Sequence, residues 1–428
     1  MTTTHLRYRE VRLPRAAENP LALIVRLVRS GLFDPYVVYE RDGAWSLAGG
    51  SLASVRLGPG AHDLSEVEQR LATMPVAGWR AYGWAAFELG AALAGADPGP
   101  GVGPDLLHLI VPSDEIRMYG EDVLVRCVDP ARLDRIVAFI DTPGAAPEPE
   151  PSASIDVPLA DTGNYRAAVA AALLELNGPG PLEKVILSRR VPVPAPVDLI
   201  TTYALGRRAN TPARSFLLDL GGIRAAGFSP ETVVEVTSDG HVRTHPLAGT
   251  RARTGSPAED ARLRAELLSD PKEIHEHAVS VRLAVEEMAA VCDDTYVNQY
   301  MTVEERGTVQ HLASRVTGRL RPGLGPWHAF AALFPAVTAT GIPKAPAYPL
   351  IRALEGRPRG LYAGSVLTCD ASGTLDAALV LRSVYERDGE CWLQAGAGVV
   401  RQSRPEREHE ETCEKLRSVA GHLVRQRP

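Results

Sequence analysis

Apolar residues that recur three and four positions apart predict several amphipathic helices along the chain. We expect one helix over 164–176 and another after Ser256, where Ser-Pro-Ala-Glu forms a capping box with proline at the first helical position. Asp270 begins a similar pattern, and the helix that follows should run to about Ala290. A last helix should open at Ser403. The apolar stripes expected to face the core are Ile274, Ala278, Val281, Val285 and Met288 in the helix after Asp270, and Cys413, Leu416, Val419, Ala420 and Leu423 in the last helix.

Shorter runs rich in branched apolar residues predict strands. We expect a strand over 184–193, and two more over 377–385 and 391–395. The last two flank Arg-Asp-Gly-Glu at 387–390, which indicates a hairpin. Because helices and strands mix without a regular βαβ alternation, the pattern favours an α+β fold over a doubly wound parallel sheet.

The segment 142–164 is rich in proline, alanine and acidic residues, which predicts a surface connection. It divides the chain into an N-terminal part, 1–141, and a C-terminal part, 165–428. The connection could join two domains or two halves of one domain.

Composition narrows the class of protein. Of 428 residues, 45% are hydrophobic and 23% charged, as in ordinary globular proteins, and the formal charge is 46 − 52 = −6 without a basic block, so we expect no nucleic-acid partner. Five scattered cysteines without a C-x-x-C predict reduced thiols in a cytoplasmic protein, and the N-terminus lacks the apolar region of a secretory signal. The longest uncharged run, 322–343, holds four prolines and three glycines, so we expect no membrane span.

Lysine is scarce: four of the 46 basic residues are lysines and 42 are arginines. Since arginine cannot lose its proton in a protein, a remaining lysine is more often found where a deprotonatable amine is needed. The four are Lys184, Lys272, Lys344 and Lys415.

Paired glutamates recur on two predicted helices. Glu273 and Glu276 share a face near one helix start, and Glu408 and Glu411 repeat the spacing on the last helix. Two such helices could converge on Mg²⁺, which prefers oxygen ligands. The alternative is that the pairs only complement the helix dipole and, with Lys415 four residues after Glu411, form solvated surface pairs.

Arg382 lies in the predicted strand 377–385, where alternation places it on the face of Val380 and Val384. An arginine in a strand that is apolar on both faces needs an anion. That anion is either an internal partner, Glu386 or Glu390, or a substrate carboxylate.

Two further groups could carry chemistry. The glycine-rich segment 394–399 follows a predicted strand and could offer backbone N–H groups to an anion, although Arg401 replaces the third glycine of a dinucleotide fingerprint. Lys184, Glu231 and His311 could form a base–acid set, whereas taken singly a histidine in a strand or a glutamate after proline is more often structural.

Ten blocks of the chain together resemble the chorismate-utilising enzymes, which include anthranilate synthase large subunits, aminodeoxychorismate synthases, isochorismate synthases and salicylate synthases. The blocks are EKVILSRR (183–190), FSPETVVEV (228–236), HPLAGTR (245–251), DPKEIHEH (270–277), VQHLASRVTG (309–318), FPAVTATGIPK (334–344), RGLYAGSV (359–366), DAALVLRS (376–383), AGAG (395–398) and PEREHEETCEKL (405–416). They follow the family's order, whereas 1–141 matches weakly, through YGWAAFEL at 82–89. The resemblance implies one large domain over 1–428, with the anthranilate synthase component I-like fold, a β-sandwich core flanked by helices.

Within the family, the details look most like salicylate synthases. Lys184 stands where water is the nucleophile, whereas aminating members tend to have glutamine, and Ala248 stands where aminodeoxychorismate synthases typically carry lysine. Thr338 and Lys344 also resemble the salicylate synthase pattern.

The resemblance further implies a reaction and its residues. Chorismate would gain water at C2, lose its C4 hydroxyl to give isochorismate, and then yield salicylate and pyruvate. Lys184 would be the base and Glu231 the acid, while His311 would line the site. The implied Mg²⁺ ligands are Glu276 and Glu411 with Glu273 and Glu408, directly or through water, and the implied substrate-binding residues are Thr250, Thr338, Tyr362, Arg382, Gly396, Gly398 and Lys415.

Two other family activities remain open at this point. The chain could be an isochorismate synthase that releases its intermediate, or an aminating subunit that needs a glutamine amidotransferase partner. Lys184 argues against the aminating alternative, so we expect no obligatory amidotransferase subunit. We expect a monomer or a homodimer.

Overall fold

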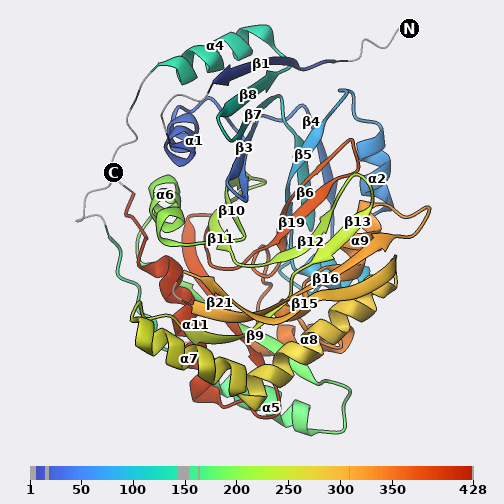
Figure 1. The fold of residues 1–428 in the computed structure, drawn as a ribbon, viewed down its shortest axis with the longest axis vertical. Coiled ribbons are helices and arrows are strands. Elements are labelled where there is room, and N and C mark those ends of the chain that lie inside the picture. The colour runs from blue at the N-terminus through green and yellow to red at the C-terminus, as the bar shows by residue number, and fades with distance from the viewer. Residues whose placement is uncertain are drawn as a thin grey trace.

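The structure is a computed structural model that describes residues 6–14, 19–142, 144, 154–161, 164–307 and 309–426. Two large sheets, whose paired strands are all antiparallel, form its centre (Figure 1). The first, in spatial order, contains β1 (Arg9–Pro14), β8 (Asp122–Cys127), β7 (Asp114–Tyr119), β3 (Ala44–Gly49), β2 (Tyr36–Arg41), β10 (Arg214–Leu220), β11 (Ile223–Ser229), β20 (Ser383–Arg387), β21 (Glu390–Val399), β9 (Lys184–Pro192) and β17 (Gly341–Ile342).

The second sheet draws strands from both parts of the chain as well. In spatial order it contains β14 (Leu247–Ala252), β16 (Val309–Leu320), β13 (His241–Thr244), β12 (Thr232–Val236), β19 (Leu375–Leu379), β18 (Ser365–Asp370), β5 (Arg80–Ala85), β6 (Leu107–Val111) and β4 (Ala53–Leu57), with β15 (Cys292–Arg306) paired to β16. Strands from residues before 142 are hydrogen-bonded to later strands in both sheets, at β2–β10 and at β5–β18.

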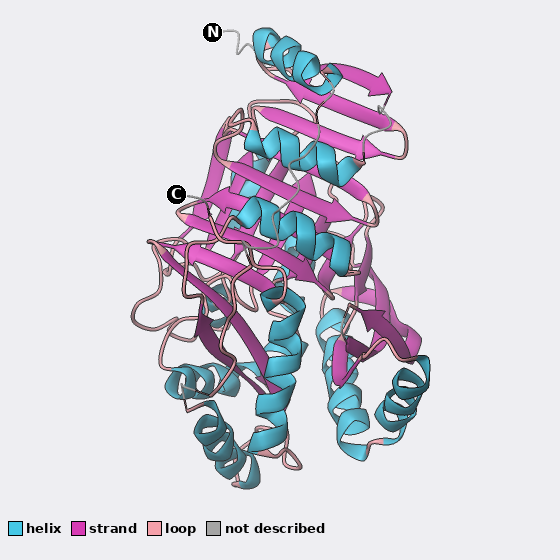
Figure 2. Ribbon diagram, turned by 90° about the vertical axis from the view of Figure 1, so that its left-hand side faces the viewer, coloured by secondary structure: helices cyan, strands magenta, loops and turns pink. Residues whose placement is uncertain are grey.

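Helices lie along the outer faces and the lower end of the sandwich (Figure 1). They are α1 (Pro20–Arg29), α2 (Ser65–Ala72), α3 (Glu88–Leu93), α4 (Pro130–Asp141), α5 (Tyr165–Asn177), α6 (Leu199–Ala209), α7 (Pro257–Ser269), α8 (Pro271–Ala289), α9 (Pro326–Leu333), α10 (Lys344–Glu355) and α11 (Pro405–Ala420), with the 3₁₀ turn η2 (Val337–Ala339). Figure 2 shows helices lying over one face of the first sheet, nearly along its strands. Among the described residues, no helix is both long enough and apolar enough to cross a membrane.

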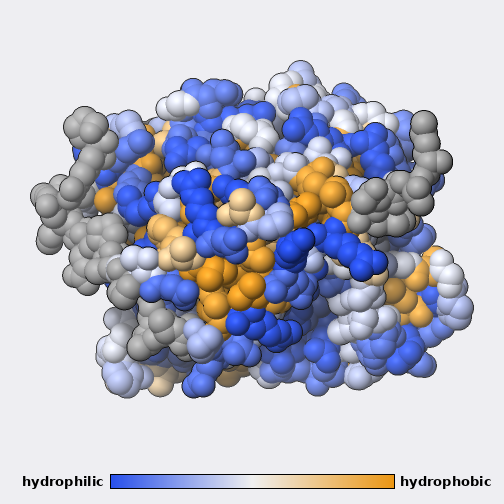
Figure 3. All heavy atoms as spheres, turned by 90° about the horizontal axis from the view of Figure 1, so that it is seen from above, coloured by the Kyte–Doolittle hydropathy of each residue, from blue (hydrophilic) through white to orange (hydrophobic). Residues whose placement is uncertain are grey.

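Two apolar cores follow from this layering. On β10, Phe216 and Leu218 pack into the core between the sheets, whereas Leu217 packs into the core under the helices of the first sheet. Because both faces of this strand are covered, apolar residues occupy three consecutive positions, 216–218, instead of alternating with polar ones. The upper face of the molecule is largely hydrophilic around an apolar area (Figure 3).

The α+β class and the sandwich core are confirmed, and so are several predicted elements. The helices after 164, 256 and 270, the last helix and the strand at 184 occur as α5, α7, α8, α11 and β9. The hairpin between β20 and β21 turns at Asp388 and Gly389, whose φ angles of 52° and 78° suit a two-residue hairpin loop. The Asp270 side chain caps α8, but the Ser256 side chain makes no cap bond on α7, and α11 begins after Arg404 instead of Ser403. In the apolar stripe predicted for the last helix, Leu423 is buried but lies beyond the end of α11 at Ala420. Most of the predicted connection 142–164 lies outside the described residues.

The continuous strand predicted over 377–385 is wrong. β19 ends at Leu379 in the second sheet, and β20 begins at Ser383 in the first, so the chain crosses between sheets at residues 380–382. Arg382 has φ of 51° at this crossing, in the left-handed region. The apolar residues run on through the crossing because they are buried in either sheet, so the sequence pattern gives no sign of it.

The glycine-rich segment is also placed differently from the prediction. It does not follow a strand but lies within β21, which runs to Val399 and pairs with β9 throughout. Gly396 lies opposite Ser188 and Gly398 opposite Ile186. The glycines therefore lie in a strand that pairs with β9 on one side, and any anion would have to bind at the other side of that strand.

Candidate active site

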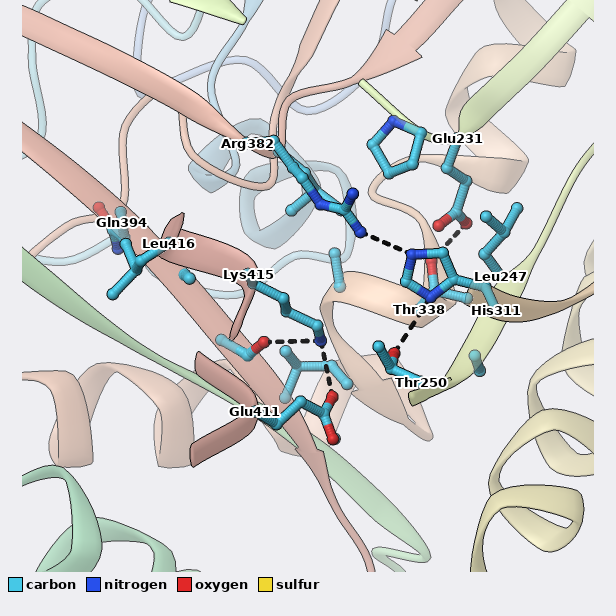
Figure 4. Close-up of a pocket in the computed structure, with 18 of the residues that line it drawn as sticks. Glu231, Leu247, Thr250, His311, Thr338, Arg382, Gln394, Glu411, Lys415 and Leu416 are labelled. Carbon is cyan, nitrogen blue, oxygen red and sulfur yellow. Dashed lines mark hydrogen bonds and ion pairs between the residues drawn. The ribbon is translucent and has the colours of Figure 1, made fainter. Parts of the chain in front are cut away.

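A pocket opens between the two sheets where β21, β14, β16, η2 and α11 meet (Figure 4). The space between its lining atoms, counted out into the open solvent at its mouth, is about 760 Å³. Most of the predicted site residues line it, and Lys184, Glu273 and Glu408 lie behind its wall. The predicted residues in the lining are Glu231, Thr250, Glu276, His311, Thr338, Tyr362, Arg382, Gly396, Gly398, Glu411 and Lys415.

The two glutamate pairs converge at one end of the pocket. Each of the four side chains is buried, with 6% or less of its surface exposed. The Lys272 ammonium lies among them, 3.4 Å from Glu273 Oε1, 3.5 Å from Glu276 Oε2 and 3.3 Å from Glu408 Oε1. The alternative of solvated surface pairs is therefore wrong for both helices.

Two oxygens of this carboxylate cluster have no donor. Among the described residues, no hydrogen-bond partner reaches the buried Glu408 Oε2 and Glu411 Oε2. Burial and the neighbouring Glu411 raise the pKa of Glu408 to about 7, whereas Lys415 and Lys272 outweigh burial and lower the pKa of Glu411 to about 2. Buried carboxylate oxygens without donors favour a cation.

The cluster fits Mg²⁺ by the chemistry of its donors, since all four are carboxylates. Among the described residues, however, no three candidate ligands converge into a preformed shell, because the Lys272 side chain lies among the carboxylates. Despite burial, those carboxylates raise the pKa of Lys272 above its ordinary value. A metal would therefore have to compete with this ammonium group.

Arg251, at the end of β14, holds Glu273 in place. Its Nη1 lies 2.9 Å from Glu273 Oε1, and the Thr250 backbone N–H donates to the other carboxylate oxygen over 3.1 Å. Sequence reasoning missed Arg251 and assigned no role to Lys272, although both lie in blocks that carried the resemblance.

Lys184, the first residue of β9, is fully buried and points toward α8. Its Nζ lies 3.0 Å from Glu276 Oε1 and donates to Ser280 Oγ over 3.0 Å. The predicted base is thus linked directly to a carboxylate of the cluster.

Glu231 lies across the pocket, just before β12, and 3% of its surface is exposed. Thr338 Oγ1 in η2 donates a hydrogen bond to Glu231 Oε1. Burial raises the pKa of Glu231 to about 8, so this carboxyl is protonated at neutral pH. A buried, neutral carboxylic acid can donate a proton.

Arg382, His311 and Thr250 form a hydrogen-bonded chain beside Glu231 (Figure 4). Arg382 Nη2 lies 2.6 Å from His311 Nε2, and Thr250 Oγ1 lies 3.1 Å from His311 Nδ1. Because a guanidinium only donates, Nε2 accepts and Nδ1 carries the proton, which it donates to Thr250. Burial and Arg382 lower the pKa of His311 well below its usual range, so the ring is neutral and orients the guanidinium.

Arg382 has no carboxylate partner within ion-pair distance among the described residues. The predicted internal partners pair elsewhere: Glu386 lies 2.7 Å from Arg224, and Glu390 lies 2.7 Å from Arg190. Its Nη1 donates to the Arg306 carbonyl over 3.2 Å. Burial lowers the pKa of Arg382 only to about 10, so Arg382 remains a cation. A buried cation without a carboxylate partner favours the binding of an anion on this side of the pocket.

The glycines of β21 form a strand edge in the pocket that no further strand covers within the described part of the chain. Opposite them, the N–H groups of Ile186 and Ser188 donate away from β21, to the Thr340 carbonyl and the Glu355 carboxylate. Antiparallel pairing then turns the peptide groups of Gly396 and Gly398 away from β9, and β20 pairs with β21 only as far as Leu393. A Cβ at Gly398 would lie 2.1 Å from Glu276 Oε1, so only glycine leaves room for the cluster.

Lys415 completes this end of the pocket. Its Nζ lies 2.8 Å from Glu411 Oε1 and donates to the Gly396 carbonyl over 3.0 Å. Lys344, by contrast, lies outside the pocket lining, where its Nζ pairs with Glu287 over 2.7 Å.

Comparison with known proteins decides the family. The sequence pattern of the family described as chorismate binding enzyme matches residues 36–421. The chain belongs to this family. A salicylate synthase of Mycolicibacterium paratuberculosis is 43% identical over 411 residues, which cover 91% of this chain and 90% of that protein.

Solved structures of the family confirm the fold. The menaquinone-specific isochorismate synthase of Escherichia coli superposes with a TM-score of 0.75 at 22% identity, covering 96% of this chain and 94% of that one. Anthranilate synthase component I of Streptococcus pneumoniae gives a TM-score of 0.71 at 24% identity, covering 96% and 92%. The predicted anthranilate synthase component I-like fold is therefore correct.

Proposed function

We propose that this family member is a Mg²⁺-dependent salicylate synthase, which converts chorismate into isochorismate and then into salicylate and pyruvate. The observation that carries the proposal is the polarity of the pocket, with a carboxylate cluster suited to a cation at one end and, at the other, Arg382, which has no carboxylate partner among the described residues. Chorismate bears two carboxylates and fits between two such ends. The similarity to a salicylate synthase over nine-tenths of both chains supports the subfamily.

The residues of this chain orient the substrate. Arg382, held by His311, and Tyr362 bind the enolpyruvyl carboxylate, while Lys415 and the Gly398 N–H hold the ring carboxylate. Glu276 and Glu411, with Glu273 and Glu408, hold Mg²⁺. When bound, the metal neutralises the ring carboxylate and draws electron density from the ring.

Proton transfer then takes place on opposite sides of the ring. Lys184 takes a proton from water as its oxygen bonds to C2, and Glu231 gives its proton to the C4 hydroxyl, which leaves as water while the double bonds shift. Only the neutral amine of Lys184 can take the proton from water. Isochorismate next loses pyruvate in a pericyclic step, for which the pocket mainly holds the reactive conformer.

The decisive experiment is incubation of the purified protein with chorismate and Mg²⁺, without any ammonia source. Salicylate fluorescence together with free pyruvate supports the proposal. Accumulation of isochorismate without pyruvate would identify an isochorismate synthase, and dependence on ammonia would identify an aminating enzyme. We expect the chain to act in the cytoplasm without an amidotransferase subunit.

Two variants of this assay test the roles. Lys184→Ala should abolish chorismate turnover but spare pyruvate loss from added isochorismate, whereas equal loss of both steps would refute a role restricted to the first step. Excess EDTA should abolish chorismate turnover, and excess Mg²⁺ should restore it. Full activity in EDTA would show that the four-glutamate assignment is wrong.

A further inference from the structure

Arg359 lies behind the pocket and makes no part of its lining, yet its guanidinium contacts two of the segments that form the site. Its side chain is 1% exposed. Nη1 donates to the Ala339 carbonyl and Nη2 to the Ile186 carbonyl, each over 2.8 Å. One planar group thereby joins η2 to β9.

The two segments carry the proposed acid and base chemistry. Ala339 ends the turn in which Thr338 donates to Glu231. Ile186 lies two residues after Lys184 on β9, and its own N–H donates to the Thr340 carbonyl over 2.8 Å. The distance between the base and the donor to the acid is therefore set across this junction.

Glu355 fixes the guanidinium from the other side. Its carboxylate pairs with Arg359 in a bidentate fashion, over 2.5 Å and 3.0 Å, and also accepts the Ser188 N–H over 2.7 Å. The same Ser188 lies opposite Gly396 on β21. The pair thus neutralises its own charge while ordering the strand that faces the glycine edge.

Aromatic rings cover the remaining faces of the guanidinium. Its Cζ lies 4.4 Å from the centre of the Phe87 ring and 5.7 Å from that of Tyr362, which lines the pocket. The Arg359 backbone N–H donates to the buried Glu88 carboxylate over 2.7 Å. Lysine could supply the charge at this point, but not a planar fork with donors in these directions.

We propose that Arg359, held by Glu355, is a positioning residue that sets the separation of Lys184 from the Thr338–Glu231 pair and the tilt of the Tyr362 ring. It touches no substrate and acts through the backbone of η2 and β9. This inference rests on the proposed function, since it assigns a role to Arg359 through the residues that the proposal places in the reaction. It adds the requirement that β9 and η2 be held at a fixed separation by a residue outside the pocket lining.

The test compares Arg359→Lys with Arg214→Lys. Arg214 is a matched control, because it is also buried in a bidentate carboxylate pair, with Asp376 Oδ1 and Oδ2 at 2.8 Å each, but lies outside the pocket lining. Both variants should melt at a lower temperature than the wild type. Only R359K should lose kcat, by about 10- to 100-fold, with KM for chorismate within about threefold.

A second comparison asks whether the effect passes through η2. In a Thr338→Val background, R359K should cost several-fold less in kcat than in the wild type, since the contact it positions is already gone. A wild-type kcat for R359K, an equal loss in R214K, or full additivity with T338V would overturn the proposal. If R359K does not fold, Glu355→Gln against Asp376→Asn gives the same comparison with the arginines kept. Failure of the wild type to consume chorismate would instead refute the proposed function.

Discussion

At the scale of single residues, the site combines a buried acidic group that is neutral with a buried basic group that is charged. Among the residues that the structure describes, no cation forms an ion pair with the buried Glu231, which is held neutral, and no carboxylate pairs with the buried Arg382, which stays charged. A neutral His311 orients Arg382 without cancelling its charge. The pocket therefore offers a proton donor and an anion site close to each other.

The hydrogen bond from Thr338 to Glu231 gives a pH-dependent prediction. It favours the carboxylate and lowers the pKa of Glu231, against the larger effect of burial that raises it to about 8. A general acid must be protonated, so kcat should fall above about pH 8 in the wild type. Thr338→Val removes the donor, raises the pKa further and should move this alkaline limb to higher pH. We would measure kcat from pH 6 to 10.

Thr368→Val is a suitable control, because Thr368 lies on β18 outside the pocket lining and its hydroxyl has no hydrogen-bond partner in the part of the chain that the structure describes. Its alkaline limb should match that of the wild type. A limb that stays fixed in T338V would show that Glu231 is not the group that titrates.

Arg382→Lys tests the anion site. Lysine keeps the charge but cannot bond His311, the Arg306 carbonyl and a carboxylate with one planar fork. We expect KM for chorismate to rise about tenfold or more, with a smaller change in kcat. Arg224→Lys, at an arginine that already pairs with Glu386, should leave KM unchanged. Equal KM values in the wild type and R382K would remove Arg382 from the substrate site.

At the scale of elements, the free edge of β21 is what places backbone groups in the pocket. Gly398 has an ordinary backbone conformation, so alanine can adopt it, but the new methyl would meet Glu276 and the Lys184 side chain. Gly398→Ala should therefore lose chorismate turnover by a factor of about 100 or more while melting within a few degrees of the wild type. Steady-state kinetics and thermal melting check both parts.

Gly180→Ala is the matched variant, since a Cβ there meets nothing within 4 Å. It should retain full turnover. A G398A enzyme with wild-type kinetics would mean that the cluster does not need the space above β21.

Local signals predicted the elements well, and long-range ones were missed. The Asp270 cap and the proline-containing start at 403–406 lie next to the helices that they open, so α8 and α11 could be predicted from nearby residues. The crossing at Arg382 and the pairing of Gly398 with β9 depend on strands far away in sequence, which no local pattern encodes. Resemblance named the site residues, but it gave Lys272 no role, because only the fold shows which carboxylates surround it.

At the scale of the whole molecule, a buried polar cluster ties the two sheets together. Asp376 on β19 accepts both bonds from Arg214 on β10, a hydrogen bond from the Tyr39 hydroxyl on β2, and an ion pair with Arg41 at 3.0 Å. One carboxylate of the second sheet thus satisfies three groups of the first. These polar contacts join the two sheets in addition to the apolar packing of Phe216 and Leu218 between them.

Asp376→Ala should therefore destabilise the protein without changing its chemistry. It leaves the Tyr39 hydroxyl buried without its partner and Arg214 with its 2.6 Å pair to Glu235, so the loss should be smaller than the roughly 3–5 kcal/mol that leaving a buried charge unpaired typically costs. Denaturant unfolding should show that loss, while kcat and KM for chorismate, measured well below the melting temperature, should stay within about twofold of the wild type. Asp134→Ala, at an exposed position of α4, controls for removal of a carboxylate. A D376A protein with unchanged stability would mean that apolar packing alone holds the sheets together, whereas a large loss of turnover would show that their separation shapes the pocket.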